Sequence, residues 1–127
     1  MTRYSLGVQQ GFSAKHYLIG GDFGPESDLH SHDYRVEIIF EGNKLSENGF
    51  LVNIATVQTH LSRLVARFKG STLNSLPEFE GKNPSCEEFC NVFLDAIKKE
   101  LARENLSGVE VKIWESSEAW ASVRLDL

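Results

Sequence analysis

The sequence predicts an α+β protein in which a four-stranded antiparallel sheet carries two helices on one face. Three observations predict this fold: two segments with strand-like alternation at the start, two amphipathic helical segments in the middle, and two short alternating segments at the end. The chain has 127 residues, 41% of them hydrophobic, which is enough to form a normal core. We therefore expect a single domain that spans residues 1–127.

The first two strands are predicted at about residues 4–17 and 32–40. In the second, large apolar residues recur at every second position and so share one face of the sheet: Tyr34, Val36, Ile38 and Phe40. Gly, Pro, Asp and Ser are frequent in residues 20–28, which predicts a loop between the strands.

Two helices follow, and each has a recognisable start. Asn53 is a good N-cap for the first helix, and Ser85 with Glu88 three residues later forms a capping box for the second. Gly70 is a typical stop for the first helix. Each helix has an apolar stripe at helical spacing: Ile54, Val57, Leu61, Leu64, Val65 and Phe68 in the first, and Phe89, Val92, Phe93, Ala96, Ile97 and Leu101 in the second.

Two strands close the chain at about residues 109–115 and 120–125. The turn between them is short, near residues 116–118, so we expect a hairpin. Glu115 falls on the same face as the apolar residues of its strand, which should be the buried face. A small sheet leaves open edges, and pairing between subunits is one way to cover them.

The composition excludes several classes of protein. The net charge is −5, with 18 acidic and 13 basic residues and no basic run, which argues against a nucleic-acid-binding protein. No apolar run is long enough for a membrane span, and the N-terminus lacks the apolar core of a signal peptide. Cys86 and Cys90 lie four residues apart on a helix, where packing is a better role than a disulfide. This cysteine usage indicates the reducing cytoplasm.

Three of the four histidines lie near predicted strand ends. His30 and His32 are two residues apart and project to the same face, and His16 closes the first strand. If the strands are neighbours, the three imidazoles can converge in a set that holds zinc with one position open to water or substrate. The alternative is chance, because a lone histidine is usually a hydrogen-bonded surface or half-buried residue. His60, off the apolar stripe of its helix, is predicted to be a surface histidine without a role.

Six segments, taken in order along the chain, are similar to a known family. This series resembles the 6-pyruvoyl tetrahydropterin synthase and 6-carboxytetrahydropterin synthase family, and the resemblance covers nearly the whole chain. The segments are Phe12-Ser13-Ala14-Lys15-His16, Leu29-His30-Ser31-His32-Asp33-Tyr34, Gly49-Phe50-Leu51-Val52-Asn53-Ile54, Thr72-Leu73-Asn74, Asn83-Pro84-Ser85-Cys86-Glu87 and Val111-Lys112-Ile113-Trp114-Glu115.

The resemblance implies the tunnelling fold (T-fold), with strands and helices in the order β-β-α-α-β-β and subunits that join their sheets into a barrel. It implies a homo-oligomer, typically a hexamer of two stacked trimers, with active sites between subunits. It also implies zinc held by His16, His30 and His32, and a pterin substrate, usually dihydroneopterin triphosphate. Glu115 would be the pterin anchor, and Glu87 would help to line the pterin pocket.

The chain also departs from the family pattern. Most members carry a cysteine four residues before the first histidine of the pair, where this chain has Glu26. A type III branch that is associated with 6-hydroxymethyl-dihydropterin has glutamate there as well. An Asp-His pair of the proton relay aligns with Lys69-Gly70, so both relay residues are missing.

These residues suggest a chemistry and its alternatives. Zinc could bind the hydroxyls of a polyol side chain and lower their pKa, while Glu26 removes a proton as the base. Glu115 could accept both N–H donors of a pterin ring, because a buried carboxylate needs a partner. The alternatives are a solvated loop glutamate for Glu26, an ion pair with Arg124 or simple exposure for Glu115, and a first-turn acid favoured by the helix dipole for Glu87.

We therefore expect a zinc-dependent pterin synthase or lyase. Its product could be the pyruvoyl compound of tetrahydrobiopterin synthesis, the carboxy compound of queuosine synthesis, or 6-hydroxymethyl-dihydropterin. Two other hypotheses remain open: a non-catalytic zinc- and pterin-binding protein that lost the relay, and an enzyme with a shifted substrate in which Lys69 or another residue transfers the proton. Trp114 and Trp120 could stack on a pterin, although strand tryptophans are more often packing residues.

Overall fold

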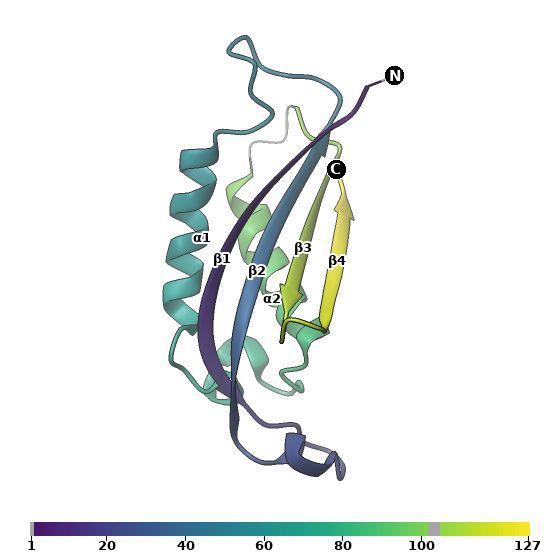
Figure 1. Ribbon diagram of the computed structural model, residues 1–127. Helices are drawn as coiled ribbons and strands as arrows, with labels where there is room; N and C mark the ends of the chain where they lie inside the picture. Colours follow the sequence, from purple (N-terminus) through teal and green to yellow (C-terminus); the bar gives the residue numbers. More distant parts are fainter. Residues whose placement is uncertain (1, 102–104) are drawn as a thin grey trace.

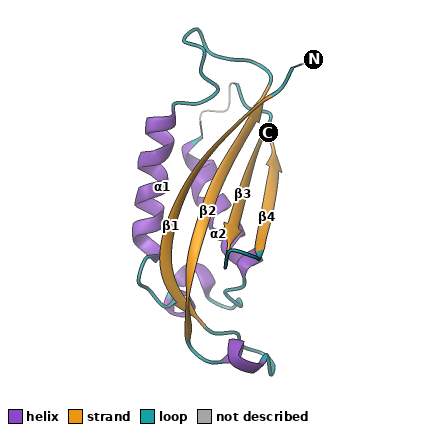
Figure 2. Ribbon diagram, viewed as in Figure 1, coloured by secondary structure: helices purple, strands orange, loops and turns teal. Residues whose placement is uncertain are grey.

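Four antiparallel strands form one sheet in the order β1-β2-β3-β4, and both α-helices cover the same face of it (Figures 1 and 2). The computed structural model describes residues 2–101 and 105–127. The strands are β1 (Tyr4–His16), β2 (His30–Gly42), β3 (Gly108–Trp114) and β4 (Trp120–Asp126), and the helices are α1 (Ile54–Phe68) and α2 (Cys86–Ile97). Four short 3-10 turns complete the structure: η1 (Gly24–Ser27), η2 (Leu73–Ser75), η3 (Pro77–Phe79) and η4 (Lys98–Glu100). The predicted α+β architecture is confirmed.

Both predicted helix starts are confirmed by side-chain caps. The Asn53 side chain accepts a hydrogen bond from the Thr56 N–H at 3.3 Å, and Ser85 Oγ accepts one from the Glu88 N–H at 3.1 Å. Each cap satisfies a backbone donor that has no partner inside its helix. Among the described residues, no helix has the length and apolar character needed to cross a membrane.

Two element ends differ from the prediction. β2 begins at His30 instead of residue 32, because His30 pairs with His16 at the end of β1. α2 ends at Ile97, and the chain tightens into η4 before Leu101. Leu101 is therefore outside the helix, although it still packs against the core.

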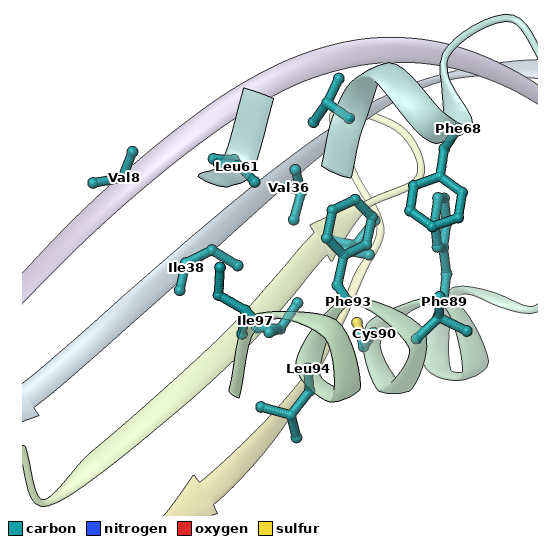
Figure 3. Close-up of a cluster of buried hydrophobic side chains, with 14 of the residues drawn as sticks. Val8, Val36, Ile38, Leu61, Phe68, Phe89, Cys90, Phe93, Leu94 and Ile97 are labelled. Atoms are coloured by element: carbon teal, nitrogen blue, oxygen red, sulfur yellow. The ribbon is translucent and has the colours of Figure 1, made fainter. Parts of the chain in front are cut away.

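The core lies between the sheet and the two helices (Figure 3). Val36 and Ile38 of β2 point toward Phe93 and Ile97 of α2, and all four side chains are 0–2% exposed. Burying one such side chain contributes about 1.5–3 kcal/mol relative to leaving it in water. This burial holds the helices on one face and leaves the other face of the sheet polar over most of its length.

The β1-β2 pair continues beyond the shorter β3-β4 hairpin. β2 pairs with β3 only between Arg35 and Glu41, whereas its pairing with β1 continues to His30. The two long strands thus extend at the end where the loop with η1 projects in Figure 1. This extension carries the three histidines away from the densest part of the core.

Neither strand tryptophan belongs to the apolar core. Lys112 Nζ lies 4.6 Å from the Trp114 ring centroid and 4.0 Å from that of Trp120, within the range of cation–π attraction. Trp120 is 54% exposed, so the packing role predicted for it is wrong.

Candidate metal centre

The structure brings His16, His30 and His32 together. In the β1-β2 register His16 lies directly opposite His30, and His32 lies opposite Ala14, so all three side chains are on the face that the helices cover. The ring centroids are 4.5–4.9 Å apart, and the Nε2 atoms of His30 and His32 are 3.0 Å apart. Two nitrogens at this distance either share a proton or face a common cation.

Backbone carbonyls orient two of the rings. His16 Nδ1 lies 2.7 Å from the Pro84 carbonyl oxygen, and His30 Nδ1 lies 2.6 Å from that of Asp28. A carbonyl can only accept, so each Nδ1 carries the proton and donates it. Each Nε2 is then left with a free lone pair, which is the arrangement that metal-binding histidines use.

Glu26 adds a carboxylate to the cluster. Its Oε2 is 3.0 Å from His30 Nε2 and 3.9 Å from the Nε2 atoms of both His16 and His32. Glu26 sits in η1, in which Pro25 is the second residue, and the Glu26 carbonyl accepts a hydrogen bond from the Leu18 N–H at 2.8 Å. Local backbone geometry therefore aims the Glu26 side chain at the histidines.

These residues fit a divalent metal ion. One atom from each of His16, Glu26, His30 and His32 lies within 4.8 Å of the others. Ligands of one tetrahedral zinc lie about 3.4 Å apart, because each is about 2.0–2.1 Å from the metal. His16 Nε2 is buried and has no hydrogen-bond partner among the described residues. A buried polar atom without a partner is unfavourable, and an ion at this position would satisfy it.

Burial also favours the neutral form of His16, which is the form that binds metal. Desolvation lowers the pKa of His16, and the neighbouring imidazoles of His30 and His32 lower it further. The hydrogen bond to Pro84 and the charge of Glu115 act in the opposite direction, but the pKa remains below its ordinary value.

Glu115 lies against two of the histidines, a contact that its predicted role as a pterin anchor does not require. It follows β3 directly, and its Oε1 is 3.5 Å from His16 Nε2 and 3.4 Å from His32 Nε2. The side chain is 27% exposed, so simple exposure does not describe it. Arg124 bonds instead to Glu41, at 2.7 and 3.2 Å, so the structure does not form the alternative ion pair with Glu115.

A shallow hollow beside the histidine cluster brings Glu115 and Glu87 to one surface. Glu87 is in the first turn of α2. The hollow lies between the start of α2 and the β3-β4 turn, and its wall consists of Cys86, Glu87, Glu115, Ala119, Trp120, Ala121 and Ser122. Cys86 and Cys90 are free thiols, as predicted, but only Cys90 is fully buried. The hollow could hold a small planar ligand against two carboxylates.

Sequence reasoning gave no role at this site to Tyr34, which lies beneath the cluster. Its hydroxyl is 3.5 Å from His16 Nδ1, and its ring packs on Phe12 and Phe89 with 2% exposure. Burial raises the pKa of Tyr34, and the charge of Glu115 raises it further, so the phenol is neutral. Alternation along β2 placed Tyr34 with the apolar core residues, and only the fold shows that its hydroxyl reaches a histidine.

Lys69 and Gly70, which align with the Asp-His pair of the family's proton relay, directly follow α1. Lys69 is exposed, and Gly70 has φ +73°, a conformation that favours glycine. The Gly70 N–H donates to the Ser13 carbonyl at 2.8 Å. His60 is half-buried, with its side chain 21% exposed and Nδ1 3.8 Å from Glu100 Oε2, so it is less exposed than the surface position predicted for it.

The sequence was compared with known proteins. The sequence model of the family described as 6-pyruvoyl tetrahydropterin synthase matches residues 5–126. The chain belongs to this family. A relative from Archaeoglobus fulgidus, provisionally named as a 6-carboxy-5,6,7,8-tetrahydropterin synthase, is 29% identical over 119 residues, which is 94% of each chain.

Solved structures of 6-pyruvoyl tetrahydropterin synthases share the fold. The Caenorhabditis elegans protein superposes with a TM-score of 0.86 at 16% identity, over 99% of this chain and 98% of the other. A Plasmodium vivax 6-pyruvoyltetrahydropterin synthase in which a catalytic glutamate is replaced by alanine gives 0.83 at 17% identity, over 100% of both chains. The expected T-fold of this family is confirmed.

Proposed function

We propose that this member of the 6-pyruvoyl tetrahydropterin synthase family is a zinc-dependent enzyme that acts on the side chain of dihydroneopterin triphosphate or a related pterin. One observation carries the proposal: three imidazole nitrogens and the carboxylates of Glu26 and Glu115 meet at one end of the sheet. Family membership supplies the substrate class.

His16, His30 and His32 would hold the zinc, and their Nε2 atoms face one another. Bound zinc supplies a Lewis acid that polarises side-chain hydroxyls of the substrate. Glu26 would act as the base, because its carboxylate lies 3.0–3.9 Å from the same nitrogens and the side chain is 45% exposed. A proton on a carbon or hydroxyl beside the cluster is then within its reach.

Glu115 and Glu87 would bind the pterin ring. A single carboxylate can accept the ring N–H and the amino N–H₂ together, which gives a strong charge-assisted pair. The two carboxylates line the same hollow next to the histidines. A ring anchored there would direct its side chain toward Glu26 and the zinc ligands.

Glutamate at position 26 favours 6-hydroxymethyl-dihydropterin as the product. Most family members have a cysteine at this position, and the branch that forms this product has glutamate. In the Plasmodium vivax protein the substituted catalytic residue is also a glutamate. A glutamate can therefore be a catalytic residue on this fold. The alternative is a binding protein without turnover, which the absence of an Asp-His pair at Lys69-Gly70 favours.

We also propose that the active protein is a homo-oligomer, a hexamer of two trimers. Edge strand β4 and the hollow next to it are open in the single chain. Ile19, Phe23 and Leu29 are 44–58% exposed in the loop that carries Glu26. A partner subunit that covered these residues would also close the site.

A metal and turnover analysis tests the proposal. The purified protein should contain about one zinc per chain, and His30→Ala should lose it while the control His60→Ala retains it. The zinc form, incubated with dihydroneopterin triphosphate, should yield a shortened pterin by mass spectrometry. Glu26→Gln should retain zinc and lower the rate about 10²- to 10⁴-fold, the usual contribution of a general base.

Each outcome separates the hypotheses. Tight pterin binding without turnover would support the alternative, a non-catalytic pterin-binding protein. Loss of zinc from Glu26→Gln would make Glu26 a metal ligand instead of a base. A zinc-free wild-type protein with normal turnover would contradict the metal site.

A further inference from the structure

We propose that Asn74 and Asn83 form an amide clamp that positions Glu26 over the histidine cluster; this inference rests on the proposed role of Glu26 as the base. The clamp grips residues 17–19, which continue from β1 after its pairing with β2 has ended at His16. Asn74 lies in η2 and Asn83 in the loop before α2, and they are 57 and 64 residues from the backbone groups that they bind.

Each asparagine binds one residue through both of its backbone groups. Asn74 Oδ1 accepts the Tyr17 N–H at 3.0 Å, and its Nδ2 donates to the Tyr17 carbonyl at 2.8 Å. Asn83 does the same to Ile19, at 2.7 and 2.8 Å. A side-chain amide offers an acceptor and a donor in one plane, as a peptide group does. The two side chains therefore replace the missing partner strand.

The residue between the two clamped ones bonds to Glu26. The Leu18 N–H donates to the Glu26 carbonyl at 2.8 Å. Alternation along an extended segment explains this geometry, because Leu18 points its backbone groups away from the side that the asparagines occupy. Fixing residues 17 and 19 thus fixes the backbone of Glu26, whose carboxylate reaches the histidines at 3.0–3.9 Å.

Asn83 is coupled to the metal ligands as well, whereas Asn74 is not in direct contact with them. The residue after Asn83 is Pro84, whose carbonyl accepts the His16 Nδ1–H at 2.7 Å. Asn74 belongs to η2, whose approach to β1 is held by a hydrogen bond from the Lys15 N–H to the Ser71 carbonyl at 2.9 Å. Asn74 is therefore the better residue for a test, because changing it leaves the Pro84–His16 bond in place.

The test uses isosteric variants of Asn74 in the full chain. Asn74→Leu keeps the side-chain volume and removes both hydrogen bonds, whereas Asn74→Asp keeps the acceptor and loses the donor. The matched control is Asn48→Leu, at an exposed turn position. For each variant we would measure zinc per chain, kcat, KM, and the hydrogen-exchange rate of peptides that cover residues 17–28.

Asn74→Leu should retain zinc, speed exchange in residues 17–28, and lower kcat about 10- to 100-fold with KM changed less than about threefold. A displacement of a catalytic group by about 1 Å can cost roughly 10²-fold in rate, which sets this scale. Asn74→Asp should lie between Asn74→Leu and wild type in exchange rate. The double variant Asn74→Leu with Glu26→Gln should be no slower than Glu26→Gln alone, because Asn74 acts through Glu26.

Unchanged exchange in residues 17–28 of Asn74→Leu would overturn the clamp. Faster exchange with an unchanged kcat, in a protein that Glu26→Gln inactivates, would overturn the positioning role. A wild-type protein that turns over no pterin would instead overturn the proposed function, and the zinc and turnover measurements on wild type identify that case before any variant is made.

Discussion

Two backbone carbonyls decide which histidine nitrogens are available at the cluster. The Pro84 and Asp28 oxygens accept hydrogen bonds from the Nδ1–H groups of His16 and His30, so each Nε2 keeps a lone pair that can bind a metal ion. The available atoms also matter at Glu115, which is half-buried. It could anchor a pterin only if its carboxylate oxygens have lone pairs free to accept hydrogen bonds. Single atoms, rather than residue types, determine what this site can bind.

At this scale we predict the effect of Glu115→Gln on pterin binding. The amide keeps the size of the side chain but loses the charge that strengthens both hydrogen bonds to the ring. Hydrogen bonds to charged groups contribute about 1.5–3 kcal/mol, so the Kd for a pterin should rise roughly 10- to 100-fold. Fluorescence titration with the pterin and a zinc assay would measure both properties.

The exposed Glu118, in the β3-β4 turn, offers a control for that experiment: Glu118→Gln should leave pterin affinity unchanged. If Glu115→Gln loses zinc, Glu115 is a metal ligand, as its distances of 3.4 and 3.5 Å to two imidazole nitrogens allow. An unchanged Kd would remove Glu115 from the pterin site.

Among the elements, α2 connects the core to the site. Phe89 of α2 is fully buried and contacts the rings of Phe12, Tyr34, Phe68, Phe79 and Phe93 at centroid distances of 5.2–5.8 Å. All of these contacts except that with Phe93 are edge-to-face, and such contacts add to the free energy of burial. Through Tyr34, which reaches His16, the packing of α2 also supports the histidine cluster.

We predict that Phe89→Ala lowers the free energy of unfolding by about 3–5 kcal/mol, because it leaves a cavity in a close-packed core. Urea denaturation followed by circular dichroism would measure the change. Phe50→Ala, at a side chain that is 51% exposed, is the control and should cost far less. A loss below about 1 kcal/mol for Phe89→Ala would contradict the packing described here.

A second prediction concerns the ion pair that ties the end of α1 to η3. Arg67 forms two hydrogen bonds to the Glu78 carboxylate, and these bonds lower the pKa of Glu78 below its ordinary value of 4.5. A lowered folded-state pKa contributes stability above the unfolded-state pKa, and that stability is lost as the pH falls through the folded-state pKa. The pair should therefore stabilise the protein at pH 7 and cease to do so in acid, below pH 4.5.

A double-mutant cycle of Arg67→Ala and Glu78→Ala, by urea denaturation at pH 7 and again at about pH 3, would test this. Because both side chains are partly exposed, at 47% and 28%, solvent screens the pair and we expect only a weak coupling at pH 7. Coupling that persists undiminished in strong acid would contradict the ion-pair origin.

At the scale of the whole molecule, the sheet edges bear on how the chains assemble. β1 and β4 are the edges of the sheet in the single chain, and exposed strand edges tend to pair. Segment 70–72 already binds part of the β1 edge, through the Ser13 carbonyl and the Lys15 N–H. The described residues form no such backbone hydrogen bond on the outer edge of β4, so that edge is open to a neighbouring subunit.

We predict a particle of about six chains, with six times the 14.3 kDa mass of one chain. Light scattering coupled to size-exclusion chromatography would measure it, over a dilution series at micromolar concentration. Closed assemblies should keep their mass on dilution, because large obligate interfaces dissociate slowly. A mass near that of one chain would contradict the hexamer and the placement of the site between subunits.

Periodicity and local capping were sufficient to predict the strands, the helices and the starts of both helices, because these features depend on residues within a few positions of one another. The placement of His30 and His32 on one face of the sheet follows from strand alternation in the same way. The resemblance of six ordered segments then predicted the family, which the match over residues 5–126 shows.

The arrangement of the site depends on contacts between distant parts of the chain. The register that sets His16 opposite His30, the carbonyl of Pro84 on His16, and the grip of Asn74 on Tyr17 join residues that are far apart in the chain, up to 68 positions for the Pro84–His16 bond. Such contacts depend on where the packed core leaves the loops, and no local pattern encodes that position. Local sequence patterns therefore specify which chemical groups this chain carries, whereas long-range packing specifies which of their atoms meet.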